Sequence, residues 1–372
     1  MIFGCDHSIS IAGQGKGCYM LQVARTTMSP RITVRDVAAA ARVHFTTAAR
    51  ALKNDPRISA ETCARVKDAA RQLGYMPDPM MSAFAAYRQK DQIPKFRGTI
   101  AWVTNFPKRH DWHNLASDRY YDGAVQQAAE LGYQLEEFWL HEPKMTAKRA
   151  SQILFSRGIR GLLLAPQPHN RGHLSLRWED FSVVSFGYSM VRPKVHLVAP
   201  AHFRAVVTCF RQLRALGHRK IGFYCEHSKD ERNDRLWSSA FLSERELLPE
   251  SREIPLLMPK VYAAPPLLQW YRRYRPTAII TTYQGSGPLK WLRDAKCRIP
   301  QEVSIAFLNT EQTSLNVAGI NEHSAQIGIA AVNLLAGMLQ RGERGLPEAP
   351  LRVLVEGVWA DAPTVRSLQA GD

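Results

Sequence analysis

A basic segment near the start of the chain, residues 32–57, holds the residue types and spacings best suited to reading DNA. Its pattern predicts two short helices, over residues 36–41 and 45–52, separated by a tight turn. Thr33 stands three residues before Asp36, the spacing of a capping box at a helix start. The second helix is basic, as in helix-turn-helix proteins, which place this helix in the major groove of DNA.

A third helix has to cover the first two, because helices this short are not stable alone. Ser59 supplies its start signal and Gly74 its stop signal. Its apolar positions form one stripe: Val66, Ala69, Ala70 and Leu73. The three helices predict a DNA-binding domain over residues 31–76. The alternative, an ordinary helical hairpin inside a core, fits less well with the turn and the two prolines that follow.

A second set of candidate residues follows the first strand expected in the rest of the chain, at residues 99–103. Polar groups mixed with aromatic rings suit a sugar, whose hydroxyls need hydrogen bonds and whose C–H faces stack on rings. The alternative for the same residues is a solvent-facing loop. The residues are Asn105, Phe106, Trp112, His113 and Asp118.

The remainder of the chain, residues 98–372, alternates strands with helices, which predicts an α/β body of parallel sheets flanked by helices. Strands are expected at residues 99–103, 133–140, 161–164, 181–186, 220–224, 278–282, 304–308 and 352–357. Helices are expected at residues 119–131, 146–157, 201–216 and 326–340. About nine or ten strands are too many for one compact unit, so we expect two Rossmann-like lobes with a ligand cleft between them.

Length, charge and cysteine content indicate the number of domains, the kind of partner and the redox state of the thiols. The 372 residues suggest two or three domains, and the formal net charge of +16 suggests a polyanionic partner. The charge is concentrated in residues 31–97, which carry 13 Lys and Arg against 6 Asp and Glu. The six cysteines form no C-x-x-C pair, so we expect reduced thiols in a cytoplasmic protein, with no disulfide framework, metal or cofactor. No apolar run is long enough to span a membrane.

The sequence has no arrangement of residues typical of catalysis. There is no G-x-S-x-G nucleophile elbow, since Val183 stands where Ser185 would need a glycine two residues before it. The histidines form no H-E-x-x-H pair. The body therefore looks like a binding module and not an enzyme. Two other classes stay open: a transport-type sugar-binding protein, which would not need residues 32–88, and an enzyme that processes DNA or sugars.

Four runs of residues carry a resemblance to a known family: T-V-R-D-V-A-x-x-A-x-V, T-x-A-x-R-A-L, D-P-R-I-S and L-G-Y-x-P. On these runs the chain resembles the lactose-repressor (LacI/GalR) family of bacterial transcription regulators, from residue 32 to about residue 366. The resemblance implies a hinge helix within residues 77–97 and a two-lobed body like a periplasmic binding protein. It also implies three crossings between the lobes. The first lobe would hold residues 98–197 and 322–350, and the second residues 198–321 and the tail.

The resemblance also implies which residues of the first domain touch DNA. Base edges would be contacted by Phe45, Thr46 and Arg50. Arg50 suits guanine and Phe45 a thymine methyl group. The phosphate backbone would be contacted by Thr33, Thr47, Ser59, Thr62 and Tyr75. Apart from the resemblance, we expect Lys53 to strengthen binding to all DNA sequences alike, as a phosphate contact does.

In the expected hinge helix, Met81 and Phe84 would share one face, and Phe84 would wedge into the central base step of the operator. The chain departs from the family pattern at Arg42 in the turn, at His44 before the second helix and at Lys53 after it. Arg42 is a poor residue for a left-handed backbone. These departures leave the operator sequence open.

The body departs from the family pattern where ligands bind. Asn309 stands where the family has an Asp, Tyr283 where it has an Asn, and Trp237 where it has an Arg, with Arg235 nearby. The departures remove fixed charges, so we expect a neutral pocket rich in aromatic side chains. The candidate effector contacts are Asn105, Phe106, Trp112, Asp118, Arg235, Trp237, Tyr283 and Asn309.

Together these features predict a sequence-specific DNA-binding transcriptional regulator. It would be a homodimer on a pseudo-palindromic operator in double-stranded DNA. A small molecule, a carbohydrate or a derivative of one, would control its operator affinity. Residues 1–30 have no part in this reading. We expect residues 1–27 to be disordered, or absent from the native product if Met28 is its start.

Overall fold

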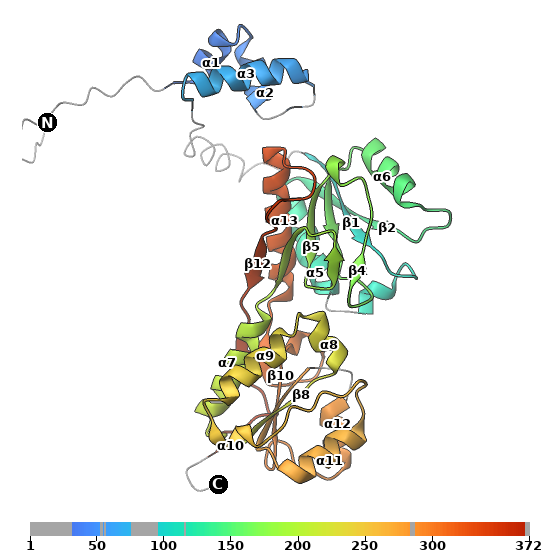
Figure 1. Cartoon of the computed structure of the whole chain (residues 1–372), viewed down its shortest axis with the longest axis vertical. Coiled ribbons are helices and arrows are strands. Elements are labelled where there is room, and N and C mark those ends of the chain that lie inside the picture. The colour runs from blue at the N-terminus through green and yellow to red at the C-terminus, as the bar shows by residue number, and fades with distance from the viewer. Residues whose placement is uncertain are drawn as a thin grey trace, which may run out of the picture. The chain divides into compact units, whose positions relative to one another are not determined.

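The computed structural model describes residues 32–52, 55, 57–75, 96–114, 117–282 and 287–368. The chain forms two compact units, one up to Pro77 and one from Asp78 (Figure 1). Each unit has its own hydrophobic core. The chain therefore consists of a small helical unit and a large α/β body. The alternation of strand and helix patterns in the sequence predicts the α/β body.

The N-terminal unit holds three helices, α1 (Val34–Ala40), α2 (Phe45–Leu52) and α3 (Ala60–Gln72). The first begins two residues before its expected start, directly after Thr33. The backbone N–H and the hydroxyl of Thr33 both donate to Oδ2 of Asp36, each at 2.7 Å, so the expected pairing of these two residues is confirmed. These hydrogen bonds lower the pKa of Asp36.

Small side chains let the three helices pack closely. The core of this unit consists of buried residues from all three: Val37, Ala38, Ala41, Ala48, Ala51, Val66, Ala69 and Ala70. Leu73, expected in the same stripe, is the C-cap residue of α3 and is partly exposed. Gly74 ends the helix with φ of 65°, a left-handed conformation that favours glycine.

The body contains two separate sheets. The first has the strand order β12-β7-β5-β3-β1-β2, and its strands pair in parallel. They are β1 (Gly98–Thr104), β2 (Tyr133–Trp139), β3 (Gly161–Leu164), β5 (Ser182–Phe186), β7 (His196–Pro200) and β12 (Arg352–Val355). A two-stranded parallel ladder, β4 (Gly172–His173) with β6 (Met190–Arg192), lies apart from this sheet.

The second sheet has the order β13-β11-β10-β9-β8 and is parallel except for β13. Its strands are β8 (Ile221–Tyr224), β9 (Ala278–Thr281), β10 (Ser304–Phe307), β11 (Gly319–Asn321) and β13 (Val358–Ala360). The sequence-based reading missed β4, β6, β7, β11 and β13. Four of these, β4, β6, β11 and β13, have only two or three residues each. Strands this short show no recognisable hydrophobic pattern in the sequence.

Helices cover both faces of each sheet, because alternate strand residues point to opposite sides. The first lobe has α5 (Ser117–Glu130) and α13 (Ser324–Arg341) on one face and α6 (Ala147–Ser156) on the other. The second lobe has α7 (His202–Ala215) and α9 (Leu236–Arg245) on one face, and α11 (Ala264–Tyr274) and α12 (Gly287–Asp294) on the other. The short elements are η1 (Asp111–Asn114), η2 (Trp178–Asp180), η3 (Thr310–Gln312), α8 (His227–Arg232) and α10 (Pro249–Arg252).

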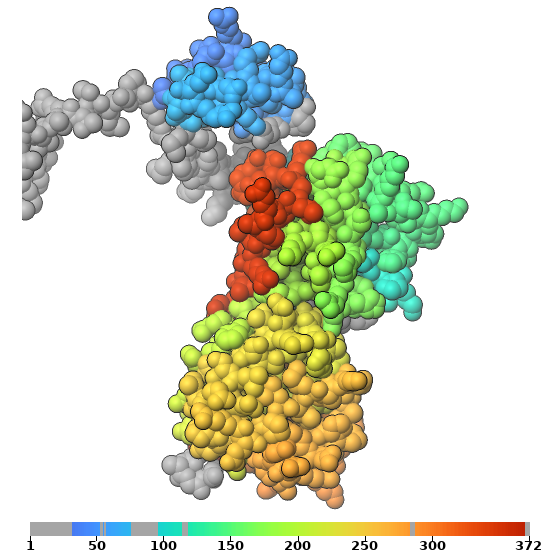
Figure 2. All heavy atoms as spheres, in the orientation of Figure 1, coloured from blue at the N-terminus to red at the C-terminus, as the bar shows by residue number. Residues whose placement is uncertain are grey.

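The chain passes between the lobes three times, after β7, after β11 and after β12. Figure 2 shows the returning C-terminal segment, in red, against the green first lobe. The expected lobe boundary at residue 350 was wrong, since β12 pairs with β7 and belongs to the first sheet. The second lobe resumes with β13, which pairs with β11.

The helices α5 and α13 approach so closely that two glycines are required between them. A Cβ atom on Gly123 would lie 2.0 Å from the carbonyl oxygen of Ala325, and one on Gly328 would lie 2.0 Å from that of Tyr120. Backbone therefore packs against backbone here. This contact fixes the start of α5, and with it Tyr120, against the returning helix.

Candidate functional site

Helix α2 presents two different faces. Ala48 and Ala51 are fully buried against the other helices, whereas Phe45, Thr46 and Arg50 are exposed. Phe45 keeps 46% of its surface exposed. The three residues expected to contact base edges thus share the open side of one helix.

The residues before α2 fix its start. Arg42 adopts φ of 51°, so the turn takes the left-handed conformation although no glycine is present. Nδ1 of His44 lies 2.9 Å from the hydroxyl of Thr46, and its ring lies 5.0 Å from that of Phe45. The guanidinium of Arg35 lies 6.0 Å from the centre of the Phe45 ring. The side chains of His44 and Arg35 thus flank the Phe45 ring.

Two of the expected phosphate contacts, Ser59 and Thr33, lie at helix starts. Ser59 caps α3: its hydroxyl accepts from the backbone N–H of Thr62 at 3.3 Å and donates to the Thr62 hydroxyl at 2.9 Å. Thr33 caps α1, as described above. Thr47 is half-buried, and Tyr75 packs against the core of the unit. Helix starts attract phosphate because their N–H groups point outward.

The loop between α2 and α3 is braced by an ion pair. The guanidinium of Arg57 donates to both carboxylate oxygens of Asp55, at 2.9 and 2.7 Å. These hydrogen bonds hold the pKa of Asp55 at about 2. Lys53, Met81, Phe84 and Tyr283 lie outside the described residues, as does the N-terminal extension. Their expected roles remain predictions.

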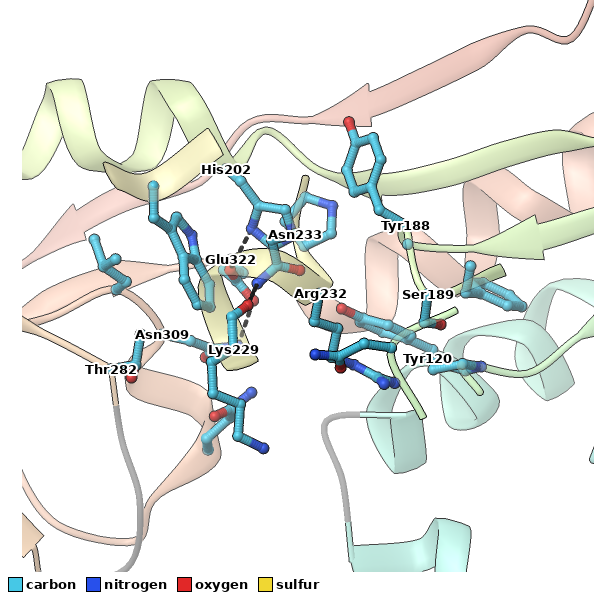
Figure 3. A pocket seen from close by; sticks show the side chains of 18 of the residues that line it. Tyr120, Tyr188, Ser189, His202, Lys229, Arg232, Asn233, Thr282, Asn309 and Glu322 are labelled. Atoms are coloured by element: carbon cyan, nitrogen blue, oxygen red, sulfur yellow. Dashed lines mark hydrogen bonds and ion pairs between the residues drawn. The ribbon is translucent and has the colours of Figure 1, made fainter. Parts of the chain in front are cut away.

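In the body, a cleft of about 950 Å³ lies between the two lobes. It is lined by residues that follow the carboxyl ends of strands, as expected for a parallel sheet. Gly187 and Ser189 follow β5, Thr282 follows β9, Asn309 follows β10 and Glu322 follows β11. Figure 3 shows His202, Asn309 and Glu322 grouped on one side of the cleft and Tyr120, Tyr188 and Ser189 on the other.

The most unusual group in the cleft is Glu322, whose side chain is 5% exposed. Asn309 donates a hydrogen bond to it from Nδ2, and Nδ1 of His202 lies 3.7 Å from its Oε1. Burial raises the pKa of Glu322 to about 8, and burial lowers the pKa of His202 to about 4. Both groups are therefore neutral at pH 7, and their contact is not an ion pair.

Two further carboxylates line the cleft, and each has a partner. Glu311 lies 3.4 Å from the guanidinium of Arg119 and accepts a hydrogen bond from the backbone N–H of Ser324 at 2.8 Å. Asp118 lies 3.2 Å from Nδ1 of His113. The pair of Arg119 and Glu311 joins the first lobe to the second.

Two more hydrogen bonds join the lobes near α8. The side-chain amide of Asn170 donates to the carbonyl of Ser228 at 2.5 Å, and the guanidinium of Arg232 donates to the carbonyl of Gln167 at 2.5 Å. Burial lowers the pKa of Arg232. Lys229 also lines the cleft, so α8 contributes two cationic side chains to it.

The structure brings only some of the sequence-predicted effector residues together. Asp118, Trp237 and Asn309 line the cleft. Arg235 is not among the lining residues; it is exposed and lies 3.6 Å from Glu231. Its backbone has φ of 57° in the turn between α8 and α9.

The loop after β1 turns away from the cleft for most of its length. Phe106 and Trp112 are buried in the core of the first lobe. Asn105 donates to Gln167 at 3.0 Å and pairs with His141 at 3.0 Å. The expectation of a neutral pocket was also wrong, because three cations and three acids line the cleft: Arg119, Lys229, Arg232, Asp118, Glu311 and Glu322.

Sequence reasoning missed Glu322, Arg232 and Lys229. Glu322 had a signal, since it directly follows a buried strand, but that strand has three residues and was itself missed. Lys229 and Arg232 lie three residues apart in a run rich in charge, H-S-K-D-E-R, where the sequence does not indicate which side faces inward. Trp237 was found, and its ring stands edge-on to His202 at 5.2 Å.

Over the described residues, no group of three or more His, Cys, Asp or Glu side chains is arranged to hold a metal ion. Cys63, Cys209, Cys225 and Cys297 are free thiols. None of the helices in the described part of the chain has the length and hydrophobicity needed to cross a membrane.

Comparison with known proteins agrees with the two units. Residues 33–78 match the family model of bacterial regulatory proteins, lacI family, and residues 210–357 match a periplasmic binding protein-like domain. The HTH-type transcriptional repressor CytR of Escherichia coli (strain K12) is 48% identical over 48 residues, which are 13% of this chain and 14% of that protein. The similarity to this curated relative is thus confined to the DNA-binding unit.

Solved structures agree with the whole fold. A transcriptional regulator CelR–cellobiose complex is 18% identical with a TM-score of 0.51, covering 90% of this chain and 100% of its own. The lac repressor dimer bound to operator and the anti-inducer ONPF is 16% identical with a TM-score of 0.51, covering 91% and 100%. Residues 33–78 thus form a domain of the lacI family of bacterial regulatory proteins, and residues 210–357 belong to a periplasmic binding protein-like domain, in a chain with the fold of these solved structures.

Proposed function

We propose that the protein is a sequence-specific, DNA-binding transcriptional regulator whose operator affinity is controlled by a carbohydrate bound in the interlobe cleft. The observation that carries this proposal is the open face of α2. Phe45, Thr46 and Arg50 stand exposed on a helix whose other face is buried. That helix lies within the segment that matches the lacI-family model.

In this proposal α2 enters the major groove, Arg50 reads guanine through two parallel hydrogen bonds, and Phe45 packs on a thymine methyl group. The hydroxyls of Thr33 and Ser59, at two helix starts, contact phosphates. Thr47, Thr62 and Tyr75 support these contacts. The protein acts as a homodimer on a two-fold operator, in keeping with the lac repressor dimer of the same fold.

The cleft supports an effector of the sugar class. Aromatic faces from Tyr188 and Trp237 stand beside hydrogen-bonding groups from Asn233 and Asn309. Rings and polar groups together suit the C–H faces and hydroxyls of a sugar. The relative CelR is described in complex with cellobiose, and the lac repressor with the anti-inducer ONPF. The protein on this proposal is a regulator inside the cell and not an enzyme.

Fluorescence anisotropy with duplexes tiled along the promoter next to the protein's own gene tests DNA reading. One tile should bind well above random DNA of the same length. Arg50→Ala should cost about 1–3 kcal/mol on that tile and relax its preference at one base pair. Equal losses on the tile and on random DNA would contradict base reading by Arg50.

The matched control is Arg71→Ala, which removes an arginine of the same domain that is already ion-paired, with Asp68. It should weaken binding to both DNAs alike and by less. Effector control is tested by repeating the titration with sugars that shift the melting temperature of the protein. If no such sugar changes operator affinity, the proposal of carbohydrate control fails.

A further inference from the structure

The charges that line the cleft do not cancel within it. Three acids and three cations face the same cavity. Of the acids, Glu322 is only 3% exposed; it accepts a hydrogen bond from Asn309, and Nδ1 of the neutral His202 lies 3.7 Å from its Oε1. Burial raises its pKa to about 8, so it is uncharged at pH 7. Two charged carboxylates, Asp118 and Glu311, remain to oppose three cations.

Those two carboxylates already have partners. Glu311 pairs with Arg119 at 3.4 Å and binds the backbone N–H of Ser324. Asp118 lies 3.2 Å from His113, at the far end of the loop after β1. Neither forms an ion pair with α8 among the described residues. The positive charge of α8 in the cleft is therefore uncompensated.

The acids on α8 itself also point elsewhere. Asp230 is buried and accepts hydrogen bonds from the backbone and hydroxyl of Ser238. Glu231 lies 3.6 Å from Arg235, outside the cleft. Lys229 and Arg232, by contrast, form no ion pair with any residue that the structure describes.

Arg232 is the more telling of the two cations. It is half-buried, its one described hydrogen bond goes to the neutral carbonyl of Gln167, and burial lowers its pKa. A buried charge without an opposite charge is costly, and the anionic group of a ligand in the cleft would supply the missing partner. Lys229 is three residues away on the same helix, so the two side chains lie on the same side of α8, and both line the cavity.

We propose that the effector is an anionic carbohydrate, whose carboxylate or phosphate is bound by Lys229 and Arg232 while its hydroxyls are bound at Asn309 and Glu322. This rests on the proposed function and narrows its ligand class. A planar guanidinium binds carboxylate and phosphate oxygens in pairs, and an ammonium adds a point charge. The neutral acid of Glu322 can donate its proton to a sugar oxygen, which a carboxylate cannot do.

The test is isothermal titration of the full chain with sugars that differ only in charge. Glucuronate and glucose 6-phosphate are each compared with glucose, and galacturonate with galactose. We expect at least one anionic sugar to bind at least tenfold more tightly than its neutral counterpart. The acid and phosphate arms identify which anionic group is used.

Three variants place the anion. Arg232→Gln and Lys229→Gln should each reduce the preference for the anionic sugar at least tenfold, while affinity for the neutral counterpart changes less. Arg235→Gln is the matched control, because Arg235 is an exposed arginine next to α8 that lies outside the cleft lining. It should leave both affinities unchanged. Unchanged operator binding by the variants without ligand verifies that they fold.

The outcomes separate the two proposals. A neutral sugar that binds as tightly as its anionic counterpart, or a preference that survives both α8 substitutions, overturns the anionic class and leaves the regulator intact. Loss of the preference in Arg235→Gln would also overturn the assignment to the cleft. If no carbohydrate of either charge binds, carbohydrate control itself fails and this inference fails with it.

Discussion

The substitution Glu322→Gln should change the free energy of unfolding of the body in a way that depends on pH. The difference between variant and parent should be more favourable to the variant at pH 8 than at pH 6.5. In the unfolded chain the carboxyl of Glu322 ionises near pH 4.5, whereas burial in the folded protein raises its pKa to about 8. Between these values the folded state binds one proton more than the unfolded state. The free energy of unfolding therefore falls as pH rises through this window.

His202 acts in the opposite direction but in a lower window. Its pKa falls from 6.5 to about 4 on folding, so the unfolded state binds the extra proton between these values and stability rises with pH there. Above pH 6.5 only Glu322 of this pair contributes. One pH unit corresponds to about 1.4 kcal/mol, so about 2 kcal/mol of stability should be lost between pH 6.5 and pH 8.

Glutamine keeps the shape and the acceptor oxygen that Asn309 uses, but it does not ionise. Urea unfolding at four pH values, followed by tryptophan fluorescence, measures the effect in the body alone, because all eight tryptophans lie after residue 97. The stability difference between variant and parent should rise by about 2 kcal/mol from pH 6.5 to pH 8. Glu356→Gln, at a side chain 64% exposed, is the control and should give a flat difference.

A flat difference for Glu322→Gln would refute the view that the carboxyl is held neutral by burial. A rise of the same size in Glu356→Gln would show that the effect is general to surface carboxylates.

Three other substitutions test separate parts of the structure. Arg42→Gly should stabilise the N-terminal unit by up to about 1 kcal/mol, because φ of 51° is costly for any residue with a Cβ atom. Slower amide hydrogen exchange in α1 and α2 would support this prediction, and faster exchange would contradict it. Gly328→Ala should destabilise the body by about 3 kcal/mol or more, because the added Cβ would lie 2.0 Å from the carbonyl oxygen of Tyr120. An unchanged midpoint of urea unfolding would mean that α5 and α13 can move apart at little cost. Asn309→Ala should weaken the best effector by about 1–3 kcal/mol in calorimetry and leave ligand-free operator binding unchanged.

The DNA-binding unit could be predicted from sequence because its signals are local. Thr33 and Asp36 mark a helix start three residues apart, Gly74 marks an end, and the buried alanines repeat with helical spacing. The expected bounds of α2 match the structure, Phe45–Leu52. Each of these signals depends on residues within one or two turns of each other, so a single sequence contains the information.

The cleft could be predicted only in part because its residues meet through long-range packing. Arg235 and Arg232 are three residues apart, but a left-handed turn after α8 sends Arg235 to the surface while Arg232 enters the cleft. Trp112 follows a strand end, as a ligand residue should, yet η1 turns it inward against Trp102 at a ring distance of 5.7 Å. Residue type suggests a role, but the direction of the backbone decides whether the side chain reaches the site.

The position of Arg232 explains why a single contact with a ligand is enough to shift the balance between arrangements of the two lobes. This residue joins the lobes through the Gln167 carbonyl and faces the cavity at the same time. A ligand shifts the balance between lobe arrangements only by binding one of them better. A tenfold preference requires about 1.4 kcal/mol, and one hydrogen bond to a charged group contributes about 1.5–3 kcal/mol. A single anionic group that reaches Arg232 in only one arrangement is therefore sufficient to select that arrangement about tenfold.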